Sequence, residues 1–275
     1  MLEQPIARIF RERATAQLLH RPRGMSAVDV VRHLVGVQAQ DAGGARLALR
    51  ARLGSVPPDD DTLVVTWLMR GTLHLVHRDD LAWLHAITAP RAMVASDRRL
   101  RQLGVTDAVA RVRAALPFTR AQAGEALGLS GQAVPHALHR AALEGHCIGD
   151  LDGNWTAFEV PRVEPDLERL AQRFAAAHPG ADLARWARIP RRDVRAADAT
   201  RVEPVETGAR LLPPFDPLTI AYGREVPGVF AGGGMFRATA VLDGRVVGTW
   251  TRPRGRVVLD PPDLAEAFAD ELDLS

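Results

Sequence analysis

Apolar positions in the first part of the chain recur with the spacing of amphipathic helices. An apolar stripe over residues 5–19 predicts an opening helix. Ser26 is a suitable N-cap for a second helix, and Gly36 stands where that helix would stop. The pattern then predicts a helix over residues 42–52, a helix that contains Trp67 and Leu68, a strand over residues 72–76 and a helix capped by Asp79 or Asp80.

The clearest structural signal lies between residues 107 and 160. Three short helical patterns are followed by two strand patterns that flank Asp152-Gly153, a dipeptide typical of tight hairpin turns. This order of elements is that of a winged helix, whose third helix would enter a groove of DNA. The alternative is a winged helix that serves only as a packing module. The side chains that the third helix would offer outward are Gln132, His136, His139 and Arg140.

The last third of the chain changes from helical to strand patterns. A helical cluster over residues 165–199 is interpreted as a contracted winged-helix module. Beyond it, the sequence predicts strands over residues 236–242, 245–251 and 256–259, with Asp243-Gly244 as the turn between the first two, and an acidic closing helix over residues 263–272.

These patterns together predict an α+β fold, with tandem winged-helix modules followed by a small C-terminal β-barrel or open sheet. Each predicted module has its own run of helices or strands. The expected domains are an N-terminal helical winged-helix module over residues 1–106, a central winged helix over 107–162, a contracted third module over 163–201 and a C-terminal β-barrel with its closing helix over 202–275.

Composition narrows the class of protein without fixing its function. The 275 residues are 47% hydrophobic and 25% charged, which is typical of a soluble globular protein. No apolar run reaches the ~18 residues of a membrane span, and we expect a cytoplasmic, nucleoid-associated protein. Cys147 is the only cysteine, which excludes an intramolecular disulfide and any cysteine-based cluster. His136 and His139 are spaced like metal ligands but lack an obvious third ligand, so we expect no metal and no cofactor.

The basic residues are all arginines, since the sequence contains no lysine. A GC-rich genome is the plainer explanation for this bias, although arginine forks also suit phosphate contacts. The formal net charge is only +2. Such a charge permits a nucleic-acid partner, if the arginines cluster in space, but does not require one.

The segment Val37-Gln38-Ala39-Gln40 is the main candidate for chemistry. Residues two apart lie on the same side of an extended chain, so Val37 and Ala39 are expected to face the core while Gln38 and Gln40 project into one cleft. Two amides there would supply acceptors and donors without net charge. Spacing alone does not distinguish this arrangement from two solvated glutamines. Asp41, which follows directly, is predicted to be a helix N-cap.

Four motifs favour a functional role for the two glutamines over simple solvation, because they occur in the order in which a known family has them. They are VGVQAQ at residues 35–40, TWLMRGTLHLV at 66–76, LLPPFDP at 211–217 and VLDGRVVGTW at 241–250. With them the chain resembles the AlkZ and YcaQ type of winged-helix DNA glycosylase over nearly its whole length. The resemblance implies tandem winged helices and a C-terminal β-barrel that cradle DNA. It also implies that Gln38 and Gln40 are the catalytic residues.

The resemblance and the predicted elements together give a set of binding residues. The expected DNA-binding residues are Arg46, Arg70, Thr72, His74, His77, Gln132, His136 and Arg140. A further candidate site on the barrel side comprises Asp216, Tyr222, Trp250 and Arg252. For Asp216, a structural hydrogen bond to a turn is an equal alternative.

The function implied is that of a monofunctional DNA glycosylase for N7-alkylated, cationic purines, with interstrand crosslinks as a further candidate substrate. The expected partner is double-stranded DNA that carries such purines, bound by a monomer without metal or membrane. The region between residues 186 and 211 is compressed relative to the family, which puts crosslink opening in more doubt than base excision. Two alternatives stay open: a non-catalytic winged-helix regulator and an enzyme on a substrate other than DNA.

Overall fold

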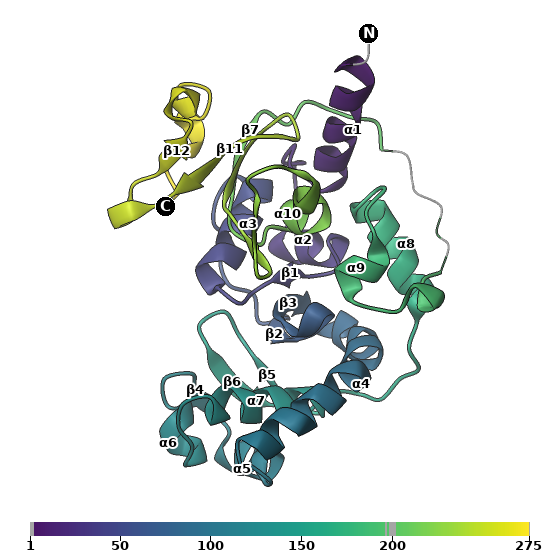
Figure 1. The fold of residues 1–275 in the computed structure, drawn as a ribbon, viewed down its shortest axis with the longest axis vertical. Coiled ribbons are helices and arrows are strands. Elements are labelled where there is room, and N and C mark those ends of the chain that lie inside the picture. The colour runs from purple at the N-terminus through teal and green to yellow at the C-terminus, as the bar shows by residue number, and fades with distance from the viewer. Residues whose placement is uncertain (1–2, 196, 198–201, 275) are drawn as a thin grey trace. The chain divides into compact units, whose positions relative to one another are not determined.

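The computed structural model describes residues 3–195, 197 and 202–274, and it is a mixed α and β structure with 45% helix and 17% strand (Figure 1). Its sheets are not closed into a barrel, so the α+β prediction is confirmed in its open-sheet form. The chain forms two compact units. Unit 1 combines residues 1–58 with 168–275, and unit 2 comprises residues 59–167. The predicted four-domain division stays a prediction.

Unit 1 begins with three helices and ends with a mostly β segment. Its sheet is antiparallel, with the strand order β12-β11-β10-β7, and β7 contacts helix α3. The helices are α1 (Glu3–Ala16), α2 (Ala27–His33), α3 (Ala42–Leu53), α8 (Leu167–Ala177), α9 (Leu183–Ala187) and α10 (Pro217–Tyr222). The strands are β1 (Val37–Gln38), β7 (Ala209–Leu212), β8 (Phe230–Gly232), β9 (Met235–Phe236), β10 (Thr239–Leu242), β11 (Arg245–Thr251) and β12 (Val258–Asp260).

The turn between β10 and β11 confirms the Asp243-Gly244 hairpin signal. Both residues have positive φ, 45° at Asp243 and 80° at Gly244, as the primed hairpin turns require. A Cβ atom at Gly244 would lie 2.1 Å from the backbone oxygen of Phe10 in α1. Glycine is therefore needed at this position for its positive φ and because any side chain would clash with the backbone of the first helix.

The predicted closing helix over residues 263–272 is wrong. The segment forms two short 3-10 turns, Pro262–Ala265 and Ala269–Glu271. Phe268 is fully buried, and the Glu271 carboxylate accepts hydrogen bonds from Arg21 at 2.5 Å and Arg50 at 3.1 Å. These contacts with distant parts of unit 1 fix the segment in a shape that its helical propensity did not indicate.

Unit 2 contains the predicted winged helix. Its strands form an antiparallel sheet in the order β3-β2-β5-β6-β4, and the long helix α4 contacts α7, which in turn contacts α5 (Figure 1). The strands are β2 (Leu63–Trp67), β3 (Leu73–His77), β4 (Phe118–Thr119), β5 (Cys147–Gly149) and β6 (Asn154–Ala157). The helices are α4 (Arg78–Gln102), α5 (Ala108–Ala115), α6 (Ala123–Leu127) and α7 (Ala133–Leu143).

The helix expected around Trp67 is wrong, because Leu63–Trp67 is strand β2. The β-branched residues Val64, Val65 and Thr66 favour a strand, and β2 pairs along its whole length with β3. Helix α4 also begins two or three residues earlier than predicted, with His77 rather than Asp79 or Asp80 as its N-cap.

Between residues 163 and 195 the chain forms two α-helices, α8 and α9, and a short 3-10 helix, Arg191–Asp193. Their core is an aromatic cluster in which His178 lies 4.8 Å from Phe174 and 5.5 Å from Trp186 between ring centroids. The helical cluster was expected to extend to about Ala199. Residues 196 and 198–201 lie outside the described part of the chain, so this boundary stays a prediction.

A fully buried ion pair joins α3 to the start of α10. Arg52 and Asp216 are both 0% exposed, and the guanidinium donates two hydrogen bonds to the carboxylate, at 2.8 Å and 3.0 Å. The same carboxylate caps α10 by accepting from the backbone N–H of Leu218. Removal of one partner would leave the other charge buried without compensation, which is strongly destabilising.

The ion pair continues into a buried hydrogen-bond network. Arg52 also donates to the side-chain oxygen of Gln17 at 3.3 Å, and the Gln17 amide donates to Nδ1 of His178 at 2.8 Å. The other ring nitrogen of His178 therefore carries the proton and donates to the backbone oxygen of Leu34 at 3.3 Å. One chain of polar contacts thus connects α1, α3, α8 and the end of α2.

We predict that Asp216→Asn lowers the free energy of unfolding by about 3–5 kcal/mol, because the Arg52 charge would lose its buried counter-charge. Urea unfolding of the full chain measures the change. Arg8→Gln, which breaks an exposed i,i+4 pair with Glu12, serves as the control and should leave stability unchanged. A loss below about 1 kcal/mol for Asp216→Asn would show that the pair is dispensable.

Candidate functional site

The Gln-x-Gln segment is preceded by a tight helix end. Helix α2 starts with a capping box between Ser26 and Asp29, and after it Val35 and Gly36 both have positive φ, 62° and 106°. Gly36 N–H donates to the Val31 oxygen at 2.9 Å, which completes a Schellman motif. A β-branched residue in this conformation is strained, so the predicted helix stop is confirmed with a strained valine beside the glycine.

The first glutamine, Gln38, ends the short strand β1, and Gln40 lies at a bend directly before Asp41. Val37 and Ala39 are 1% and 6% exposed, so the prediction that they face the core is confirmed. Gln38 is 9% exposed and Gln40 is exposed. The pair therefore combines a nearly buried amide with one that solvent reaches, whereas the expectation from the sequence was that both amides project into one cleft, which stays a prediction.

Asp41 is the N-cap of α3, as predicted. Its two carboxylate oxygens accept from the backbone N–H groups of Gly43 at 3.2 Å and Gly44 at 3.1 Å. A carboxylate that caps a helix in this way is engaged as an acceptor. Arg46, an expected DNA-binding residue, lies half-buried on the next turn of the same helix.

A cleft of about 730 Å³ begins at this end of α3. Its other wall is the C-terminal sheet, including the expected site residues Trp250 and Arg252. The indole N–H of Trp250 donates to the Leu212 oxygen at 2.9 Å, which holds the ring in place. The lining residues are Asp41, Gly43, Gly44, Leu47, Pro213, Pro214, Arg237, Ala238, Thr249, Trp250, Thr251, Arg252, Val258 and Asp260.

Sequence reasoning missed Arg237 in this cleft and the arginines that follow Arg252. Arg252, Arg254 and Arg256 are all exposed in the turn between β11 and β12. Arg237, Arg254 and Arg256 form no ion pair with any carboxylate in the described part of the chain. The alternation of arginine with Pro253 and Gly255 was a readable signal for an exposed basic turn.

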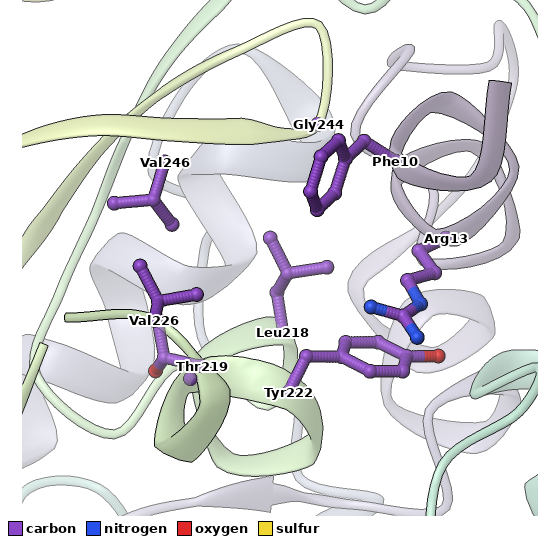
Figure 2. Close-up of a pocket in the computed structure, with 9 residues that line it drawn as sticks. Phe10, Arg13, Leu218, Thr219, Tyr222, Val226, Gly244 and Val246 are labelled. Carbon is purple, nitrogen blue, oxygen red and sulfur yellow. The ribbon is translucent and has the colours of Figure 1, made fainter. Parts of the chain in front are cut away.

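The other two barrel-side candidates lie elsewhere. Asp216 is committed to Arg52 and to the α10 cap, so its observed contacts are structural. Tyr222 is buried, its hydroxyl donates to the Pro179 oxygen at 2.9 Å, and its ring lines a separate, smaller pocket with Phe10 and Leu218 (Figure 2). The structure brings Trp250 and Arg252 together but not these two.

The expected contacts at the β2–β3 turn belong to unit 2 and form one hydrogen-bonded group. Arg70 has a φ of 60° and donates to Nε2 of His74 at 3.1 Å, while Nδ1 of His74 donates to the Thr72 oxygen at 2.8 Å. Burial and the neighbouring Arg70 charge lower the pKa of His74 to about 3, and burial lowers the pKa of Arg70 to about 10. His77 caps α4 through its ring.

The four residues that helix α7 was expected to offer to a DNA groove differ in their exposure and in their contacts. Gln132 is exposed, and His136 is half-buried and accepts from Arg99 at 3.4 Å. Arg140 pairs with Asp97 and with Glu144, so two carboxylates already balance its charge. His139 does not point outward as expected, because its ring packs 5.2 Å from that of Trp67, and its pKa is lowered to about 4 by burial.

Metal ligands and a reactive thiol are the remaining candidates for chemistry. Among the described residues, no three His, Cys, Asp or Glu side chains gather as a metal site would need. Cys147 is fully buried, and burial raises the pKa of its thiol to about 12, so it is protonated at neutral pH. In the same part of the chain, no helix is both long and apolar enough to cross a membrane.

Winged-helix elements and an arginine-lined cleft are features of DNA-binding proteins. The family model described as DNA glycosylase AlkZ-like matches residues 31–205. The chain belongs to this AlkZ-like family and is a DNA glycosylase, a hydrolase of N-glycosyl bonds. This identification favours the enzyme over the regulator and over a substrate other than DNA.

The fold has a solved counterpart. The Streptomyces sahachiroi DNA glycosylase AlkZ matches with a TM-score of 0.66 and 23% identity, over 92% of this chain and 90% of that chain. A search of curated proteins gives no significant match. The resemblance noted from the motifs is therefore confirmed at the level of family and fold.

We predict that His74 makes the protein sensitive to acid. Its pKa of about 3 in the folded protein is far below the ordinary 6.5, so below pH 6.5 the unfolded chain binds a proton that the folded chain does not. Stability is therefore lost as the pH falls from about 6.5 towards 3. His74→Gln should reduce this loss, as measured by urea midpoints between about pH 7 and pH 4. Parallel profiles for the two proteins would contradict the assignment.

Proposed function

We propose that this DNA glycosylase hydrolyses the N-glycosidic bond of N7-alkylated purines, with Gln38 and Gln40 as its catalytic residues. The observation that carries the proposal is the Gln-x-Gln segment, which lies between a strained helix end and the Asp41 cap and directly precedes Asp41, a residue that lines a large cleft. The neighbouring carboxylate of Asp41 accepts hydrogen bonds from the backbone N–H groups of Gly43 and Gly44 as the cap of α3.

The chemistry follows from the charge of the substrate. A purine alkylated at N7 is already cationic, so it leaves the sugar as a neutral base without protonation by a general acid. The bond between C1′ and the base nitrogen breaks, and its electron pair goes to the base. Water then adds to C1′ of the oxocarbenium-like sugar and loses a proton to solvent. Amide oxygens can orient that water and stabilise the developing positive charge, although they are too weakly basic to remove its proton alone.

The cleft supports this substrate class. Its volume of about 730 Å³ exceeds what a purine alone needs and lies in the range of sites for drug-sized ligands. Leu47, Pro213 and Trp250 give it apolar walls for a base and a bulky substituent. This size also favours interstrand crosslinks, in which the substituent carries a second base, as additional substrates.

The arginines at the cleft support duplex binding. Arg237 and Arg252 line it, and Arg254 and Arg256 belong to the same exposed turn as Arg252. Phosphates bound by Arg237, Arg254 or Arg256 would not have to displace a carboxylate of the described chain. Because the sequence has no lysine to form a Schiff base, the proposed activity is monofunctional hydrolysis without strand cleavage.

We predict that Gln38→Ala and Gln40→Ala each lower the single-turnover rate of 7-methylguanine release by about 100-fold or more, the effect of losing one transition-state hydrogen bond. The assay measures free base from duplex DNA, with affinity for the duplex measured separately. Gln172→Ala, which removes an exposed glutamine of α8, is the matched control and should release base at the wild-type rate. Wild-type rates in both site variants would remove the two glutamines from the mechanism.

We also predict selectivity for charged lesions. A cationic 7-methylguanine should be released at least about 100-fold faster than a neutral uracil in the same duplex context, because the amides supply no acid to activate a neutral base. The comparison uses matched oligonucleotides that differ at one position, and unmodified guanine is the background. Rapid release of uracil would contradict the proposed chemistry while leaving the glycosylase assignment intact.

A further inference from the structure

A second pocket lies apart from the Gln-x-Gln segment, among α1, α10 and the β10–β11 turn (Figure 2). Its volume is about 220 Å³. Phe10, Leu218, Val226 and Val246 give it apolar walls, and Figure 2 shows these side chains around one central space with Arg13 and Tyr222 at its end. An apolar cavity of roughly 150 Å³ is enough to bind benzene, so this pocket can hold a small organic molecule.

One unbalanced cation distinguishes this pocket from a packing defect. The Arg13 guanidinium lies 4.2 Å from the ring centroid of Tyr222, and its Nε is buried without a hydrogen-bond partner. Within the described ranges, no carboxylate pairs with Arg13. A buried donor of this kind costs free energy unless an acceptor reaches it.

The remaining polar groups of the pocket are already used by the protein. The Thr219 hydroxyl donates to the Asp216 backbone oxygen at 2.9 Å, and the Tyr222 hydroxyl donates to Pro179. The pocket therefore offers a ligand apolar contact on most sides and a cationic donor at one end.

We propose that this pocket binds a small carboxylic acid with a compact apolar body, aromatic or alicyclic, whose carboxylate pairs with Arg13. The apolar body of the ligand buries the apolar surface of the pocket walls, and the carboxylate supplies the hydrogen-bond acceptor that the guanidinium lacks. An amine of the same shape would be repelled, and an uncharged amide would offer only a weaker neutral acceptor.

The site would act on stability rather than on base release. Its walls come from α1 and α10, the helix that Asp216 caps, and α1 runs up to Gln17 of the buried polar network. A ligand that bridges the two elements binds only the folded chain and therefore raises its melting temperature with concentration. This site is independent of the proposed base-excision chemistry, since none of its residues lines the larger cleft beside α3 or belongs to the Gln-x-Gln segment.

Calorimetry and thermal melting of the full chain test the proposal with four probes: benzoate, cyclohexanecarboxylate, benzamide and benzylamine. We expect both carboxylates to bind and to raise the melting temperature, benzamide to bind at least about tenfold more weakly than benzoate, and benzylamine not to bind. Equal affinity for benzoate and benzamide, or no binding of either carboxylate at millimolar concentration, would overturn the proposal.

Two variants separate the charge from the cavity. Arg13→Met should weaken benzoate at least about tenfold and abolish its advantage over benzamide, with 7-methylguanine release unchanged. Val246→Phe fills the space and should weaken both carboxylates while keeping Arg13. Unchanged benzoate affinity in either variant would place the ligand elsewhere and contradict the assignment. The probe series on the wild-type chain decides the question even if a variant folds poorly.

Discussion

The buried pair of Arg52 and Asp216 is the constraint on which the rest of unit 1 depends. It is bidentate, fully removed from water and formed by residues from the two separate segments of that unit. Apolar residues of similar volume often replace such pairs without loss of stability, so its main contribution is to position its partners. The ion pair joins helices α3 and α10. Asp41 caps the other end of α3, so the ion pair fixes the helix that directly follows the Gln-x-Gln segment.

The segment itself is constrained from both sides. Before it, two consecutive residues with positive φ reverse the chain, and the strain at Val35 persists because Val35 is 1% exposed and packed in the core. After it, the Asp41 cap starts a rigid helix. The His178 hydrogen bond to the Leu34 oxygen adds a contact from the buried network to the end of α2. The proposed catalytic role of the two amides requires this kind of fixed backbone, since errors in position cost catalysis directly.

The sequence predicted caps and turns correctly, because they depend on neighbouring residues. It failed for two elements whose conformation depends on contacts with distant parts of the chain. Ser26, Asp41 and Asp243-Gly244 were identified correctly because caps and primed turns depend on a few neighbouring residues. The helix around Trp67 was wrong because strand pairing with β3 outweighed an ambiguous apolar run. The closing helix was wrong because Glu271 is held by arginines more than 200 positions away in the chain.

The site could be predicted in part for the same reason. The Gln-x-Gln motif and the family were readable from contiguous residues. The burial of Arg52 was not, because its partner lies 164 positions away and nothing in α3 distinguishes it from an exposed arginine. The unequal exposure of the two glutamines was also beyond an argument from alternation. The alternation of residues along an extended chain predicts on which side a side chain lies, but not how much of it is exposed to solvent.

That inequality bears on the chemistry. In the proposed cleavage of an alkylated purine, the positive charge moves from the base to the sugar, so a useful dipole must act on the sugar more strongly than on the base. Gln38, at 9% exposure, is shielded from water that would otherwise screen its dipole, whereas Gln40 remains accessible to solvent. A shielded amide suits the stabilisation of charge and an accessible amide suits the delivery of water. In the proposed mechanism, Gln38 would therefore stabilise the developing charge and Gln40 would orient the water.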